Sequence, residues 1–92
     1  MDCEWHPSKA KSNFAKHGVS FADAATVLED DLALTIRDPF SEDEERWITL
    51  GRSGAGGILV VIYTWREDCV RLISAPPAAA QEIHQYEEHH EA

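Results

Sequence analysis

The residues best suited to chemistry in this chain are three arginines, Arg46, Arg66 and Arg71, which lie on or beside strands expected to be neighbours. A guanidinium group is planar and always charged, and its N–H groups can hold two phosphate oxygens at once. The three arginines are therefore candidates for binding a phosphate and the negative charge that develops on it during a reaction. The alternative is that they form ion pairs with the acidic run at residues 42–45 and are structural.

A second group of cations lies nearer the N-terminus, where Lys9, Lys16 and His17 belong to one expected helix. His17 could transfer a proton near neutral pH, or it could bond the free carbonyl groups at the end of that helix. Further along the chain, Trp65 could stack on a nucleobase or contact a partner. Tyr63, two residues earlier on the same expected strand, is expected to be structural.

Other groupings are weaker candidates. The glycine-rich segment 51–57 is not a phosphate-binding loop, because no Gly-Lys-Ser/Thr follows it and a strand comes next, so it is expected to be a hairpin loop. His84 and Glu88 share one helical face, and His89 and His90 lie close by, but the end of a chain usually frays. We expect neither a metal site nor a cofactor.

Length and composition indicate one small domain over residues 1–92, since 43% of the residues are hydrophobic and three are Trp. No apolar run approaches the roughly 20 residues that a membrane span needs, and the N-terminus lacks a secretory pattern. We therefore expect a cytoplasmic protein that does not bind membranes. Cys3 and Cys69 are expected to be reduced and structural.

The charge of the chain limits its partners. Eight Lys and Arg against 17 Asp and Glu give a net charge of −9, and residues 72–92 contain four Glu and no Lys or Arg. Such a charge repels polyanions at long range and argues against non-specific nucleic-acid binding. It suits a basic protein partner, or simply solubility.

Two short helices joined by a tight turn are expected near the N-terminus. Pro7 suits the first position of a helix, and Gly18 can take the left-handed conformation that ends one, so the first helix is expected to stop at His17. Ser20 offers a side-chain cap to a second helix. The apolar face of this second helix consists of Phe21, Ala24, Ala25 and Leu28.

Strands are expected in most of the remaining chain. They are a short strand at residues 3–5, a half-buried strand at 32–37, a strand at 47–52, a strand buried on both faces at 58–65, and a strand at 70–75 that forms a hairpin with it. Because proline cannot donate to a strand ladder, Pro76 and Pro77 end the last strand. Pro77 is expected to begin a final helix with Ala79, Ile83 and Tyr86 as its apolar positions.

A family resemblance rests on residues spread over nearly the whole chain. They are Glu4, Trp5, Pro7, Lys9, Ala10, Asn13, the run 16–21, Ala24, Asp38, Pro39, Glu45, Arg46, Trp47, Gly51, the run 60–63, Arg71, the run 73–75, Ala78, Glu82, Tyr86 and Glu87. In these residues and their order the chain resembles the BrnT family, ribonuclease toxins of type II toxin–antitoxin systems.

The resemblance implies an α+β, RelE-like fold with two N-terminal helices, an antiparallel four-stranded sheet, with a short N-terminal strand as a further element, and a C-terminal helix. It also implies metal-independent RNA cleavage that uses the 2′-hydroxyl of the substrate as nucleophile. The implied partners are RNA and a BrnA-like ribbon-helix-helix antitoxin, with the toxin as a homodimer or in a heterotetramer with the antitoxin. The residues expected at the site are Arg46, Arg66, Arg71 and His17 for catalysis and Lys9, Lys16 and Trp65 for RNA binding.

The chain departs from the family pattern in two places. Family members usually follow Ile-Ser-Ala with an arginine and an arginine-rich helix, whereas here Pro76 follows and the helix has no cation other than histidine. The alternative function is therefore a catalytically weakened BrnT-like module that acts through an antitoxin complex. The second departure is His6, where the family prefers an Asp that would cap the first helix, at a cost of about 1 kcal/mol.

Overall fold

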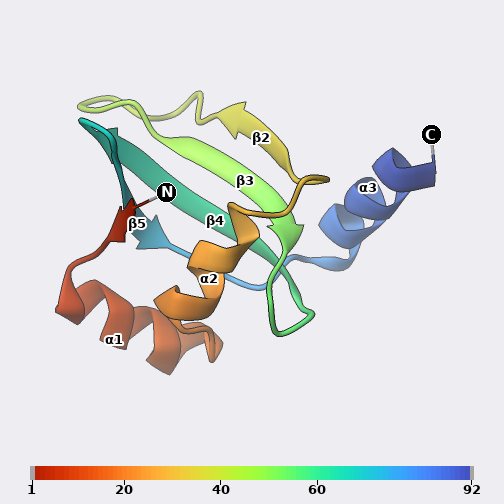
Figure 1. Cartoon of the computed structure of the whole chain (residues 1–92), viewed down its shortest axis with the longest axis horizontal. Helices are drawn as coiled ribbons and strands as arrows, with labels where there is room; N and C mark the ends of the chain where they lie inside the picture. The colour runs from red at the N-terminus through yellow and green to blue at the C-terminus, as the bar shows by residue number, and fades with distance from the viewer. Residues whose placement is uncertain (1, 92) are drawn as a thin grey trace.

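The computed structural model describes residues 2–91 and contains three helices and one five-stranded sheet (Figure 1). In chain order the elements are β1 (Asp2–Glu4), α1 (Pro7–His17), α2 (Phe21–Val27), β2 (Leu34–Arg37), β3 (Trp47–Arg52), β4 (Ile58–Arg66), β5 (Cys69–Ser74) and α3 (Ala80–Glu91).

The sheet is mixed rather than purely antiparallel. Its strand order is β1-β5-β4-β3-β2; β1 runs parallel to β5, and the other neighbours are antiparallel. The prediction of an antiparallel four-stranded sheet is thus wrong, because the short N-terminal strand β1 joins the sheet as a fifth strand, parallel to β5. A three-residue strand carries no sequence signal for its partner, because the whole chain from α1 to β4 separates β1 from β5.

Helices α1 and α2 cover one face of the sheet and close the core against it (Figure 1). Ser20 Oγ accepts a hydrogen bond from the Asp23 N–H, and Gly18 ends α1 at φ 68°, as expected. The fully or nearly buried apolar side chains of this core are Val19, Phe21, Ala24, Val27, Leu59, Val61, Tyr63, Val70, Leu72 and Ala75.

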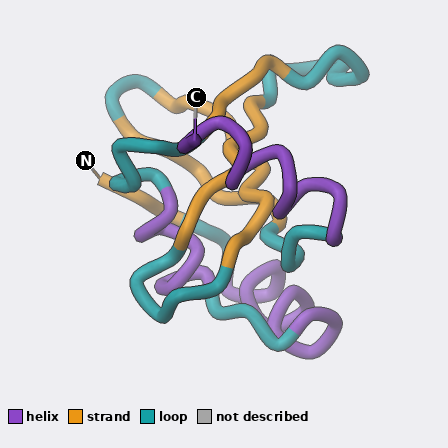
Figure 2. Tube along the Cα trace, turned by 90° about the vertical axis from the view of Figure 1, so that its right-hand side faces the viewer, coloured by secondary structure: helices purple, strands orange, loops and turns teal. Residues whose placement is uncertain are grey.

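The other face of the sheet is only partly covered. We call it the open face: it carries Val60, Ile62 and Thr64 of β4, which alternate with the buried Leu59, Val61 and Tyr63. Val60 and Ile62 are half-buried, so the prediction that this strand is buried on both faces is wrong. Helix α3 lies apart from α1 and α2, at one end of the open face (Figures 1 and 2).

The C-terminal helix begins at Ala80, three residues after the expected Pro77. The intervening segment continues the pairing with β4: Val60 N donates to Pro76 O, and Ala78 N donates to Ile58 O. Proline lacks an N–H but keeps a carbonyl acceptor, so the segment remains extended. On the helix itself, Tyr86 is buried as expected.

Two further expectations need correction. Strand β2 begins at Leu34 rather than at residue 32, and its Ile36 side chain is 59% exposed instead of half-buried. His6 does cap α1, because its Nδ1 accepts a hydrogen bond from the Ser8 N–H at 3.1 Å. The chain therefore keeps a capping side chain where the family prefers Asp.

Candidate functional site

Three arginines lie at the end of the sheet that is remote from α3. Arg71 of β5 pairs in register with Thr64 of β4, so both side chains lie on the open face. Arg66 is two residues beyond Thr64 and therefore lies on the same face, and Arg46 immediately precedes the first residue of β3. We call Arg46, Arg66 and Arg71 the arginine row.

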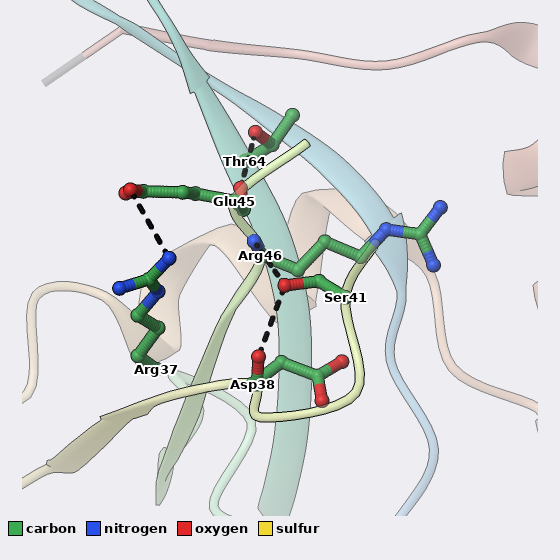
Figure 3. Close-up of polar contacts among 6 residues, drawn as sticks. All are labelled: Arg37, Asp38, Ser41, Glu45, Arg46 and Thr64. Atoms are coloured by element: carbon green, nitrogen blue, oxygen red, sulfur yellow. Dashed lines mark hydrogen bonds and ion pairs between the residues drawn. The ribbon is translucent and has the colours of Figure 1, made fainter. Parts of the chain in front are cut away.

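The loop before β3 fixes the backbone of Arg46 (Figure 3). The Ser41 hydroxyl donates to Asp38 O at 3.0 Å and accepts from Arg46 N at 3.5 Å, and the Thr64 hydroxyl donates to Glu45 O at 2.7 Å. From this anchored backbone the Arg46 side chain extends across β4 toward β5 (Figure 3). The anchoring thus points a flexible side chain toward the strand that carries Arg71.

Ion pairing accounts for little of the arginine row. Arg46 Nε lies 3.7 Å from Glu44 Oε1, and both side chains are 42% exposed, so this pair contributes at most about 1 kcal/mol. Among the described side chains, no carboxylate lies within 4.0 Å of Arg66 or Arg71, although Glu4 is the register partner of Arg71 on β1. The alternative that the three arginines serve in ion pairs with the acidic run at residues 42–45 therefore holds only for Arg46, and there the pair is weak.

The cations of α1 gather at a different place. Lys9, Lys16 and His17 line a surface pocket of about 300 Å³ that the helix forms with Ile73 and Ser74 of β5. Among the described residues, the His17 ring makes no hydrogen bond, so the expected bond to helix carbonyls is not seen. We call this pocket, with its three cations, the α1 pocket.

Asn13 holds the α1 pocket against the sheet. Its side chain is buried, its Nδ2 donates to Val19 O at 3.0 Å and to Ala75 O at 3.1 Å, and its Oδ1 accepts from Ala75 N at 2.9 Å. The sequence alone does not predict this role, because Asn13 lies among the polar residues of an amphipathic helix. It is named only among the residues that carry the family resemblance. Its hydrogen bonds fix α1 relative to the end of β5.

The two cationic groups are neighbours along β5. Strand β1 pairs with β5 only as far as Arg71, so the edge of β5 beyond Arg71 is left to the α1 pocket. Arg71 and Ser74 are three residues apart, about 10 Å along an extended strand. The α1 pocket thus lies farther along β5 than Arg71, on the side of the sheet that α1 covers.

Trp65 lies on the opposite face from the arginine row. Its ring packs edge-to-face on Tyr63 with centroids 6.5 Å apart, and it is 47% exposed. Tyr63 is buried, and its hydroxyl lies 2.9 Å from Thr49 Oγ1, in keeping with a structural role. Trp65 therefore does not join the arginines at one surface.

The remaining candidates contribute little chemistry. Within the described side chains, no group of three or more His, Cys, Asp or Glu is placed to hold a metal ion, and the side chain of His90 lies outside them. Cys3 and Cys69 are both free thiols, and burial raises the pKa of the Cys3 thiol, which keeps it protonated at neutral pH. None of the helices in the described part of the chain has the length and apolar character of a membrane span.

Together these features define a small α+β protein with a mixed sheet, two helices on one face, three arginines at one end of the other face and further cations on α1. A family model described as "Ribonuclease toxin, BrnT, of type II toxin-antitoxin system" matches residues 5–82. The chain belongs to this BrnT family, as its sequence motifs indicate.

A solved structure supports the assignment. The chain is similar to the ribonuclease toxin BrnT of Brucella abortus, whose crystal structure was determined at 1.1 Å resolution, with 27% sequence identity and a TM-score of 0.63. The similarity covers 86% of this chain and 97% of the Brucella chain. Among curated protein sequences, no match to this chain is found.

Proposed function

We propose that this chain is a cytoplasmic endoribonuclease toxin that cleaves RNA without a metal ion and is neutralised by a BrnA-like ribbon-helix-helix antitoxin. We propose, too, that residues 1–92 act as one domain of RelE-like type. The observation that carries the proposal is the arginine row on the open face, of which Arg66 and Arg71 have no ion-pair partner among the described side chains. Family membership supplies the reaction class.

In the proposed reaction, the 2′-hydroxyl of one nucleotide attacks the adjacent phosphorus. The new P–O2′ bond forms as the P–O5′ bond breaks, which leaves a 2′,3′-cyclic phosphate and a free 5′-hydroxyl. A base takes the proton from the 2′-hydroxyl, and an acid donates one to the departing 5′-oxygen. The protein must also stabilise the extra negative charge on the phosphorane-like transition state.

We assign these tasks to the two cationic groups. Arg66 and Arg71 bind the non-bridging oxygens of the scissile phosphate, and Arg46, whose side chain extends over β4, stabilises the developing charge. Lys9 and Lys16 hold a neighbouring phosphate in the α1 pocket, and His17 can transfer a proton only when the bound RNA brings the reacting 2′- or 5′-oxygen to that pocket. Trp65 stacks on a base only if the RNA turns around the end of the sheet.

The second candidate function is a catalytically weakened toxin that acts as a protein-binding module. It is favoured by the absence of Lys and Arg from residues 72–92 and by the net charge of −9. At roughly one counterion released per phosphate contact, the loss of several cations weakens RNA binding strongly at physiological salt. This candidate predicts a stable antitoxin complex without RNA cleavage.

Inducible expression in a bacterial host tests the proposal. The wild-type chain should arrest growth, co-expression of the antitoxin should relieve the arrest, and Arg71→Ala should abolish it. Arg37→Ala is the matched control, because Arg37 is an exposed strand arginine that pairs with Glu45 at 3.3 Å and lies outside the arginine row. Soluble wild-type protein that causes no arrest would contradict the toxin and favour the binding module.

A further inference from the structure

The open face carries an apolar groove at the end opposite the arginine row. The groove has a volume of about 460 Å³ and lies between the sheet and α3. Its sheet side is aliphatic and its helix side is polar. The residues that line it are Leu34, Ile36, Ile48, Leu50 and Val60 from the sheet and Glu82, Gln85, Glu88 and His89 from α3.

The groove leaves apolar surface in contact with solvent. Ile36 is 59% exposed although it stands directly opposite Ile48 in the register of β2 and β3. Ile36 is the exposed member of this aliphatic floor, since Leu34, Ile48 and Val60 are half-buried and Leu50 is buried, and a partner seated over the floor would cover it. A sheet face presents side chains rather than free N–H and C=O groups, so a partner must bring apolar side chains. The apolar stripe of an amphipathic helix does so.

The acidic residues around the groove favour a basic partner. Glu82 and Glu88 border it from α3; Glu88 Oε1 lies 3.2 Å from His84 Nε2, and among the described residues no Lys or Arg forms an ion pair with either carboxylate. A second copy of this chain would bring a further net charge of −9 to the same surface, which disfavours a homodimer here. A helix with Lys and Arg beside its apolar stripe would match both the aliphatic floor and the acidic border.

We propose that the groove binds a basic amphipathic helix of the antitoxin. This inference rests on the proposed function, since it identifies the surface through which the antitoxin acts. Val60 in the groove and Thr64 beside Arg71 are four residues apart on β4, about 13 Å. A helix seated in the groove therefore lies on the same face as the arginine row and competes with RNA for that face.

The test measures binding of the antitoxin encoded beside the toxin gene to purified full-length variants, by calorimetry at low and physiological salt. Ile36→Glu places a charge on the groove floor and should weaken binding by about tenfold or more. Its matched control is Leu32→Glu, since Leu32 is a similarly exposed aliphatic residue, at 50%, outside the groove. Glu88→Lys should also weaken binding, whereas Glu87→Lys, one residue away and outside the lining, should not.

The outcomes distinguish the groove from the antitoxin partnership on which it rests. Weaker binding in both groove variants, with unchanged controls and affinity that falls as salt rises, supports the proposal. Equal binding by all four folded variants overturns the groove and leaves the antitoxin partnership intact. No binding by the wild-type chain overturns the antitoxin partnership and the groove with it, whereas growth arrest and RNA cleavage test the toxin activity separately. Dimerisation of the isolated chain that Ile36→Glu abolishes would assign the groove to a second copy instead.

Discussion

Replacement of Asn13 by alanine should remove the hydrogen bonds that attach α1 to the end of β5 and so lower the stability of the fold. The change removes three hydrogen bonds and leaves the carbonyls of Val19 and Ala75 and the N–H of Ala75 without their partner. Both partner residues are buried, with Ala75 at 0% exposure. Each hydrogen bond contributes about 0.5–1.5 kcal/mol net, and a buried group left unpaired costs about 1–3 kcal/mol. We therefore expect a loss of about 3 kcal/mol.

That loss is large for a chain of this size. A 92-residue domain has a free energy of unfolding of about 5–14 kcal/mol, so Asn13→Ala should lower the melting temperature by roughly 12–24 °C. Urea unfolding followed by circular dichroism measures the effect, with Ser12→Ala as the control because Ser12 is exposed on the same helix. A loss below about 1 kcal/mol, or one equal to that of Ser12→Ala, would refute the reasoning.

Three other predictions concern packing, pH and salt. Gly51→Ala should lower the free energy of unfolding in urea by about 1–3 kcal/mol, because a Cβ there would lie 3.0 Å from Val27 Cγ1. Gly54→Ala is the control and should be tolerated, because a Cβ there would have no contact closer than 3.5 Å. Equal losses for the two variants would contradict this reasoning. Burial and the hydrogen bond to Asp30 raise the pKa of Tyr86, so the folded state retains a proton that the unfolded chain loses, and stability should fall as pH rises above about 10. Tyr86→Phe should flatten that decline between pH 9 and 11, and an unchanged slope would argue against the assignment. Binding of RNA through three arginines should weaken roughly 20-fold between 50 and 200 mM salt in a filter-binding assay, and salt-independent binding would rule out phosphate contacts.

Local patterns in the sequence predict much of the fold. The strand at residues 47–52, the glycine-rich hairpin loop and the Ser20 cap are all found where expected, because each depends on side-chain alternation or on turn chemistry within a few residues. The parallel pairing of β1 with β5 depends on contacts between residues more than 60 positions apart. No local pattern encodes such a contact.

The candidate site, too, combines features that local sequence patterns predict with features that depend on contacts between distant residues. The residue types of the arginine row indicate phosphate chemistry, but only the register of β4 with β5 places Arg71 beside Thr64. Trp65 directly precedes Arg66 on β4, so the alternation of side chains along the strand already places the two on opposite faces. Asn13 is a polar residue on a polar helix until the fold buries it against Ala75. The groove likewise depends on the position of α3 beside the open face, which no local pattern encodes.

The most direct test of the account is RNA cleavage by the purified chain at low salt with EDTA present. We predict cleavage products that carry a 2′,3′-cyclic phosphate, a rate at least about 100-fold lower for Arg71→Ala, and an unchanged rate for Arg37→Ala. Intact RNA after incubation with folded wild-type protein, or equal cleavage by wild type and Arg71→Ala, would contradict the central claim that the arginine row cuts RNA.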